Sequence, residues 1–211
     1  MGNKRIPFEP GKVYHVYNHG NGDDNIFRQE KNYYRFLEKY NQHLSVISHT
    51  FAYCLMPNHF HFLLMIKPES EIIEVFKTKY PKKSISELKE NLNYHNSNQF
   101  AIFLNSYSKY YNIKYNRKGS LFLDNIERKL IDNSGYFMKA LNYIHFNPVM
   151  HGFVDDISNY KFTSYYDYVM KKNKRINREL AYKLFPKNAK IDFKPKLNGI
   201  EKYALEMDMT F

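Results

Sequence analysis

Cysteine is almost absent from this sequence of 211 residues, in which Cys54 is the only one. A single thiol cannot form a disulfide within the chain or build a zinc site from several cysteines. The opening residues, MGNKRIPFEP, lack the apolar core of a secretory signal, and Ile6 replaces the Ser or Thr of a myristoylation motif. The densest apolar run, residues 60–66, is far too short to span a bilayer. These absences predict a cytoplasmic protein without a membrane partner.

Tryptophan is also missing, although the chain contains 20 Tyr and 17 Phe residues. The 32 Lys and Arg residues exceed the 21 Asp and Glu residues and give a formal net charge of +11. Positive charge attracts polyanions and aromatic rings stack on unpaired bases, so this composition suits a protein that binds single-stranded nucleic acid. An AT-rich genome, which favours Lys, Asn, Tyr and Phe codons, would give the same composition. Composition alone therefore leaves both explanations open.

The spacing of apolar residues predicts strands and helices that form one α+β domain. The expected elements, in chain order, are a strand at 12–18, a helix at 24–44, strands at 45–55 and 59–66, a helix at 99–115, a strand at 121–131 and a helix at 134–146. This order predicts an antiparallel sheet with helices packed against it. Asn147 should end the last helix, because a residue that precedes proline avoids the helical region.

Two polar segments fall outside this pattern. Residues 68–98 are charged and indicate an inserted segment, partly helical around residues 85–92. Residues 171–211 begin with the basic run KKNKRINR, which could extend a path for DNA. We therefore expect one domain at residues 1–170, followed by a basic C-terminal extension at residues 171–211.

The motif MPNHFHF contains two histidines on one predicted strand. Side chains alternate between the faces of a strand, so His59 and His61 should point the same way and Phe60 the other way. Two imidazoles in this arrangement can share one divalent ion. Two histidines packed at a sheet surface would have the same spacing. The apolar neighbours indicate a buried strand, where polar rings need a partner.

The helix predicted at residues 134–146 can bring further polar groups to the histidines. Tyr143 and Asn147 are four residues apart and therefore lie on the same side of that helix. The Asn147 amide oxygen could complete a metal site, and the Tyr143 hydroxyl could act on a group that the metal polarises. Each also has a plain structural explanation, as one of many amphipathic tyrosines and as a residue at a helix end. His145, two positions from Tyr143, should face another side.

Two motifs together resemble the signatures of one family. The segment MPNHFHFLL resembles the histidine-hydrophobic-histidine (HUH) signature of single-strand transposases. The segment YIHFNPVMHGFV, at residues 143–154, resembles the second signature of REP-associated tyrosine transposases and their insertion-sequence relatives. Further segments match in kind and order, so that the resemblance covers about residues 12–170: YHVYNHGNGDDNIF at 14–27, RKGSLF at 117–122 and YKFTSY at 160–165.

The resemblance implies a ferredoxin-like (RRM-like) antiparallel sheet with helices packed on one face. It implies that Tyr143 is the nucleophile, that His59 and His61 bind Mg²⁺ or Mn²⁺, and that Asn147 is the third ligand. The activity would be that of a nucleoid-associated transposase that forms a 5′-phosphotyrosine on single-stranded or hairpin DNA and then rejoins strands, in some relatives as a homodimer. The alternatives are a domesticated module that binds single-stranded nucleic acid without cleaving it, a metal-dependent hydrolase that uses water, and a structural protein.

Basic residues that follow the predicted central helix are candidates for phosphate contacts, although an ordinary solvated face would look the same. The candidates are Lys109, Lys114, Arg117, Lys118, Arg128 and Lys129. Asp124 and Glu127 depart from the family, in which this strand is expected to be more basic. His15 and His19 are expected to have structural roles, and no general base is identified.

Overall fold

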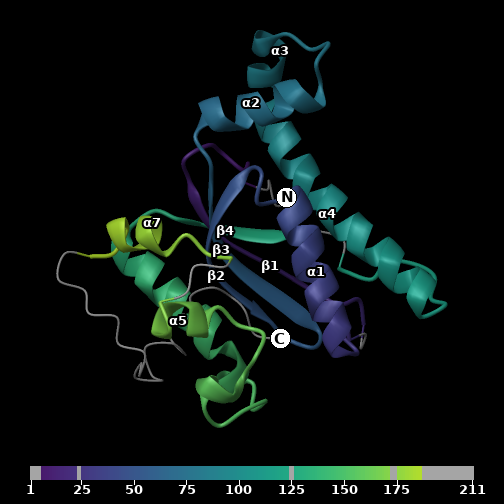
Figure 1. Cartoon of the computed structure of the whole chain (residues 1–211), viewed down its shortest axis with the longest axis vertical. Helices are drawn as coiled ribbons and strands as arrows, with labels where there is room; N and C mark the ends of the chain where they lie inside the picture. The colour runs from purple at the N-terminus through teal and green to yellow at the C-terminus, as the bar shows by residue number, and fades with distance from the viewer. Residues whose placement is uncertain (1–5, 23–24, 124–125, 172–174, 187–211) are drawn as a thin grey trace, which may run out of the picture.

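The computed structural model describes residues 6–22, 25–123, 126–171 and 175–186. Twelve short and long elements follow one another in these segments (Figure 1). They are β1 (Val13–His19), α1 (Glu30–His43), β2 (Ser48–Leu55), β3 (His59–Ile66), α2 (Glu69–Lys79), α3 (Ile85–Glu90), α4 (Leu92–Lys114), β4 (Glu127–Ile131), α5 (Ser134–Met150), a 3₁₀ turn (Ile157–Asn159), α6 (Tyr165–Val169) and α7 (Arg178–Lys183).

The four strands form one antiparallel sheet in the order β2-β3-β1-β4. The two central strands, β1 and β3, pair along their whole length, so that His19 lies opposite His59 and Tyr17 lies opposite His61. With α1 following β1 and α4 preceding β4, this is the strand order of a ferredoxin-like fold. The predicted α+β class and the antiparallel sheet are confirmed.

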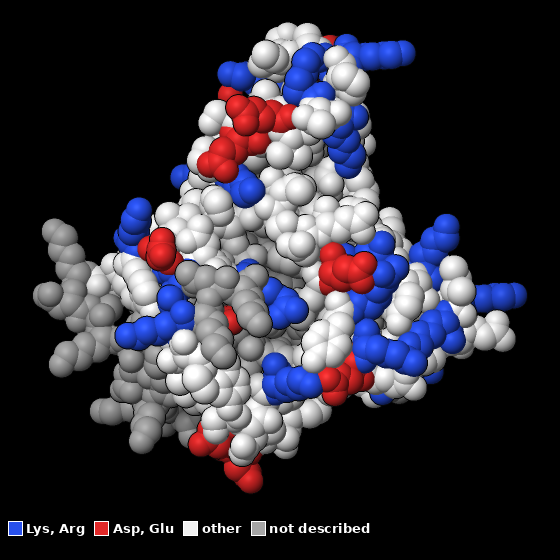
Figure 2. Space-filling view, viewed as in Figure 1, with Lys and Arg blue, Asp and Glu red and all other residues white. Residues whose placement is uncertain are grey.

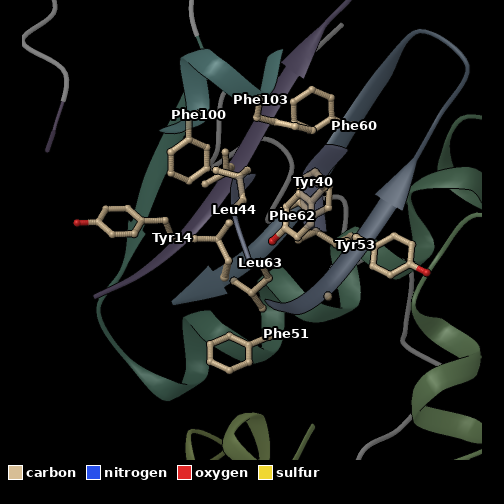
Figure 3. Close-up of a cluster of buried hydrophobic side chains, with 14 of the residues drawn as sticks. Tyr14, Tyr40, Leu44, Phe51, Tyr53, Phe60, Phe62, Leu63, Phe100 and Phe103 are labelled. Atoms are coloured by element: carbon tan, nitrogen blue, oxygen red, sulfur yellow. The ribbon is translucent and has the colours of Figure 1, made fainter. Parts of the chain in front are cut away.

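One face of the sheet is covered by α1 and α4 and is built almost entirely from aromatic rings. The Phe60 and Phe62 side chains of β3 point to this face, where Phe36 of α1 lies 5.0 Å from Phe60 and Tyr40 stacks on Phe62 at 4.2 Å. Phe103 of α4 closes the layer at 4.8 Å from Phe36. Figure 3 shows Phe60, Phe62 and Phe103 gathered in this layer. Burial of each such ring stabilises the fold by about 1.5–3 kcal/mol.

The opposite face is covered by α5, so the expectation that the helices pack on one face holds for α1 and α4 only. Phe137 of α5 lies 5.4 Å from Phe51 of β2, and the neighbouring Leu141 is fully buried. The reason is that β3 is buried on both sides, since Leu63, which points away from the Phe60 side, is also inaccessible to solvent. An apolar second face requires a second cover.

The structure corrects the predicted bounds of α5 and of the last strand. The helix α5 continues through Pro148 to Met150 instead of ending before the proline. In the last turn the missing N–H of Pro148 removes one hydrogen bond, while the His151 N–H still donates to the Asn147 carbonyl at 3.1 Å. The strand expected at 121–131 is shorter: β4 comprises Glu127–Ile131, and in the described residues before it Phe122 forms an isolated bridge with Gly20.

The inserted segment at 68–98 is more helical than its polar sequence suggests. It forms α2, α3 and the first turns of α4, which begins at Leu92 and not near residue 99. Ile72, Phe76 and Leu88 bury their side chains inside this unit. Figure 1 shows α2 and α3 projecting from the upper end of α4, away from the sheet.

The outer edge of β2 is closed by chain segments that come after α5. The Leu55 N–H donates to the Phe162 carbonyl at 2.9 Å, and the Ser164 N–H donates to the Tyr53 carbonyl at 3.0 Å. Further along, the Asn177 N–H donates to the Thr50 carbonyl at 2.7 Å. At the other side of the sheet β4 is the last strand. Among the described helices, none is long and apolar enough to cross a membrane.

Candidate active site

Polar side chains from β1 and β3 gather beneath α5. The His59 and His61 rings have their centroids 5.1 Å apart, with an angle of 82° between their planes. His61 lies 5.5 Å from the Tyr143 ring of α5, which places the histidines on the α5 face. The two rings therefore lie on one face of the sheet, as alternation along the strand predicts.

One turn of α5 supplies the groups that face these rings. The Asn147 Oδ1 atom lies 3.0 Å from the Nε2 atom of His59. The Tyr143 ring packs edge-on against His61 and lies 5.8 Å from His15. Burial raises the pKa of the Tyr143 hydroxyl well above its usual value, and a hydrogen bond with Asn147 partly opposes this effect. The phenol is therefore neutral in this arrangement.

The Nδ1 atoms of both rings contact a neighbouring polar side chain. The Nδ1 atom of His59 lies 2.8 Å from the Oδ1 atom of Asn58, and the Nδ1 atom of His61 lies 3.0 Å from the Nε2 atom of His15. The Nε2 atom of His59 thereby faces Asn147 of α5. The Nε2 atom of His61 and the Nδ2 atom of Asn147 are buried without a hydrogen-bond partner. Two buried polar atoms without partners at one place are unusual.

Neutral His59 has one N–H group, which cannot satisfy the amide oxygens on both sides of its ring. Burial lowers the pKa of His59 to about 3 and that of His61 well below its usual value, so both rings are neutral at neutral pH. A neutral imidazole carries one N–H, yet His59 faces an amide oxygen at each nitrogen. With the proton on Nδ1 towards Asn58, the lone pairs of Nε2 and of the Asn147 oxygen face each other. Rotation of the Asn147 amide would let its Nδ2 atom donate to Nε2 instead.

A divalent cation fits this donor set. Histidines that bind metals commonly hold the second ring nitrogen by a hydrogen bond, as Asn58 and His15 do here. The 3.0 Å between Nε2 of His59 and Oδ1 of Asn147 suits two neighbouring ligands, each about 2.1 Å from an octahedral ion. No three His, Cys, Asp or Glu side chains of the described segments are grouped to hold an ion. The Asn147 amide oxygen, 3.0 Å from the Nε2 atom of His59, is a group that could serve as a third protein ligand.

Three further histidines surround this site. His15, expected to be structural, contacts His61 directly, and burial followed by the charge of Lys129 lowers the pKa of His15 to about 3. His19, also expected to be structural, stacks on His59 with ring centroids 5.6 Å apart. Alternation along residues 13–19 places His15 and His19 on one strand face, so the sequence did carry this signal.

The third of these histidines, His151, comes from the residue after α5 and could not be found by periodicity. Its ring lies 5.3 Å from that of His59, and its side chain is exposed. His19 is partly exposed as well, whereas His61, Tyr143 and Asn147 are at most 1% exposed. The site therefore approaches solvent at the end of the sheet where His19 and His151 lie. His145 faces elsewhere, as predicted, with its Nε2 atom 2.8 Å from Ser164 Oγ.

The structure separates the basic residues that were candidates for phosphate contacts. Lys129 lies opposite His15 on β4 and therefore on the face of the histidines. Arg128 points to the other face, where it donates to the Ile6 carbonyl at 2.6 Å and lies over the Phe8 ring at 4.3 Å. The other candidates lie at the end of α4 and in the turn that follows it: Lys109, Lys114, Arg117 and Lys118.

Fold and site together define a class of protein: a ferredoxin-like sheet with a histidine pair on a central strand, covered by a helix that carries a tyrosine and an amide. No protein-family model matches the chain, and no curated protein matches it. A solved structure, described as a REP-associated tyrosine transposase bound to a REP hairpin, is similar over 93% of this chain and 95% of that chain, with 16% sequence identity and a TM-score of 0.51. At this identity the similarity shows the fold alone.

Proposed function

We propose that this protein is a metal-dependent enzyme that cuts and rejoins single-stranded DNA by means of Tyr143. The observation that carries the proposal is that His59 and His61 of one strand meet one helical turn, with the Nε2 atom of His59 at 3.0 Å from Asn147 and the His61 ring at 5.5 Å from the Tyr143 ring. The fold shared with a transposase that was solved on a hairpin supports DNA, single-stranded or hairpin, as the partner.

In this proposal the two histidines and the Asn147 oxygen hold Mg²⁺ or Mn²⁺. A bound divalent cation would withdraw charge from the oxygens of the scissile phosphate. In this arrangement Asn58 and His15 would accept the Nδ1 protons of His59 and His61, which would leave the Nε2 lone pairs as the metal ligands. Imidazole is a better ligand for Mn²⁺ than for Mg²⁺, which favours Mn²⁺ at this donor set.

Tyr143 acts as the nucleophile. Its hydroxyl oxygen forms a bond to phosphorus while the bond between phosphorus and the 3′ oxygen breaks, and the released 3′ oxygen takes up a proton. The phosphotyrosine conserves the bond energy, so another 3′-hydroxyl can reverse the step and rejoin DNA. The phenol must first lose its proton, which burial opposes by raising the pKa of Tyr143. Both histidines are neutral, so the positive charge that favours loss of this proton would have to come from a divalent cation held by them.

The reaction also requires a phosphate to reach atoms that are now covered. The side chains of Tyr143 and Asn147 are buried between α5 and the sheet. The nearby side chains that reach solvent are those of His19 and His151. DNA must therefore enter from that end of the sheet, with a displacement of the end of α5. The buried phenol also favours the alternative function, a module that binds single-stranded nucleic acid without cleaving it.

One assay separates these functions. A labelled hairpin oligonucleotide with an unpaired flank is incubated with the protein and Mn²⁺ or Mg²⁺, and covalent adducts are resolved on a denaturing gel. The adduct should form with the wild type, disappear in Tyr143→Phe and persist in Tyr17→Phe, whose ring lies 5.7 Å from His61 and serves as the matched control. Nicking that survives Tyr143→Phe would indicate a water-dependent hydrolase. Binding without any adduct would indicate the binding module.

A further inference from the structure

A group of cations and tyrosines lies where the first turn of α1 meets the last turns of α4. It consists of Arg28 and Lys31 at the start of α1 and of Tyr110, Lys114 and Tyr115 at the end of α4, and is called the basic–tyrosine cluster below. Figure 2 shows Lys and Arg side chains gathered on the right of the view, over the lower ends of these two helices in Figure 1. Nothing in the proposed reaction uses these side chains.

The rings of the basic–tyrosine cluster hold its cations in place. The Arg28 guanidinium lies 5.0 Å from the centroid of Tyr115, and the Lys114 ammonium lies 5.5 Å from the same ring. Lys114 also donates to the Tyr110 hydroxyl at 3.2 Å. Contacts of this kind are individually weak at an exposed surface, and they favour positions of the cations next to the rings.

A buried amide ties the two helices together beneath this surface. The Oδ1 atom of Asn32 accepts the Tyr115 hydroxyl at 2.8 Å and the backbone N–H groups of Arg28 and Gln29 at 3.0 and 2.9 Å. Asn32 itself is fully buried. The start of α1 is thus fixed against the end of α4, and the spacing of the cations is set by the fold.

The cluster holds like charges side by side. The nearby ammonium of Lys114 lowers the pKa of Lys31. In the described part of the chain, no carboxylate forms an ion pair with Lys31 or Lys114; nearby, Glu30 pairs with Lys161 and Glu38 with Arg35. Cations that a fold keeps together without a carboxylate create a positive potential that a polyanion relieves.

The cluster lies at the same end of the sheet as the site. The Phe27 N–H, next to Arg28, donates to the Pro57 carbonyl at 2.9 Å, and the Gly20 N–H donates to the Asn58 carbonyl at 2.6 Å. Both acceptors belong to the turn that leads into His59. A nucleic-acid strand that leaves the His59 side can therefore pass around this turn and reach Arg28 within a short distance.

We propose that the basic–tyrosine cluster binds the phosphodiester backbone of the single-stranded DNA flank that continues from the phosphate held at His59. The inference rests on the proposed function for the identity of the strand. The flank must be unpaired close to the scissile phosphate, so the contacts are those of Lys and Arg with successive phosphates and not with a duplex groove. The expected signature is a salt-dependent affinity.

The test uses the double variant Lys31→Gln with Lys114→Gln in a Tyr143→Phe background, which prevents cleavage. The matched control is Lys12→Gln with Lys82→Gln, which removes the same charge from the far end of the sheet and from the inserted segment. Binding of a fluorescent hairpin with an unpaired flank, and of the same hairpin without it, is measured over a range of salt. For single strands, the slope of log affinity against log salt changes by about 0.7 for each phosphate that the protein ceases to neutralise.

The cluster variant loses two lysines, so the magnitude of that slope should decrease by about 1.4 for the flanked hairpin. The control should leave the slope unchanged. An unchanged slope in the cluster variant would overturn the proposal. An equal decrease with the hairpin that lacks a flank would also overturn it, by assigning the cluster to duplex DNA. If the cluster variant shows the slope effect while the wild type forms no covalent adduct, the proposed cleavage is refuted and this inference stands.

Discussion

Phe60 and Phe62 meet aromatic rings from α1 and α4 on one face of the sheet, whereas His59 and His61 meet polar groups of α5 on the other. Both pairs come from one strand, so the same alternation builds both faces. The aromatic face contains rings in contact at 4–6 Å and no buried charge, while the histidine face leaves the Nε2 atom of His61 unpaired. We expect the aromatic face to supply most of the stability and the histidine face to supply the reactive groups.

The largest expected consequence of this difference is sensitivity to acid. Burial lowers the pKa of His15, His59 and His145 to about 3, against 6.5 for the free side chain. The unfolded chain therefore binds more protons than the folded one below about pH 6.5, and stability, fully present above that pH, is lost as pH falls towards 3. The free energy of unfolding decreases by about 1.4 kcal/mol per pH unit for each histidine, which is about 4 kcal/mol per pH unit for the three together.

Urea unfolding of the metal-free protein, followed by circular dichroism at about pH 7.5, 6.5 and 5.5, checks this expectation. The free energy of unfolding should change little over the first step and fall by several kcal/mol over the second. A value that stays constant down to about pH 5.5 would mean that these histidines are not held neutral in the folded protein.

The aromatic face can be broken by one substitution. Phe62→Ala removes a ring that stacks on Tyr40 and is 1% exposed, so it should lower the free energy of unfolding by about 3–5 kcal/mol. Because Phe62 does not touch the histidine site, folded molecules of this variant should bind Mn²⁺ as the wild type does. Urea melts and calorimetric titration with Mn²⁺ below the unfolding temperature separate the two effects.

A change at His15 should reduce the Mn²⁺ affinity, which Phe62→Ala is expected to leave unchanged. His15→Ala removes the acceptor for the Nδ1 proton of His61, so the proton can move to Nε2, and Mn²⁺ affinity should fall by about 10–100-fold. His15→Gln, whose side-chain oxygen can accept the same proton, should recover much of the affinity. Calorimetry measures the affinity, and ¹⁵N chemical shifts of His61 in the metal-free protein report the tautomer. Equal affinity in all three proteins would remove His15 from the site.

The smallest expected effect concerns stability at that same place. Replacement of both rings, His15→Leu with His61→Leu, removes a buried hydrogen bond together with the unpaired Nε2 atom. Exchange of both partners for apolar side chains of similar size is often nearly neutral, so the change should be less than about 1 kcal/mol. A decrease as large as that of Phe62→Ala would show that the two faces contribute equally to stability.

Much of the fold can be predicted from local patterns. Strand β3 begins at His59 and ends at Ile66, as predicted, because its apolar run is bounded by Pro57 and by Pro68. The end of α5 was predicted wrongly, since tertiary packing holds Pro148 in a helical turn that the local preference disfavours. The packing of helices on one face, which the family resemblance implied, holds for α1 and α4, whereas α5 covers the face of His59 and His61.

The candidate site shows the same limit. Alternation and helical spacing suffice to bring together His59, His61, Tyr143 and Asn147, whose roles as ligands and nucleophile stay predictions. The contribution of His15 depends on the register between β1 and β3, which pairs residues far apart in the chain and cannot be read from either strand alone. That of His151 depends on where α5 ends, and this was also misjudged.

The two outer strands, β2 and β4, differ in how the backbone groups at their outer edges are bonded. Backbone groups of β2 are bonded by Phe162, Ser164 and Asn177, but β4 is a terminal strand whose Glu127, Arg128 and Lys129 carry charges of both signs. Unpaired strand edges are where sheets of separate molecules join and aggregate, and charges along an edge oppose this. In the described part of the chain no strand pairs with the outer edge of β4, so loss of these charges would favour pairing between separate molecules at this edge.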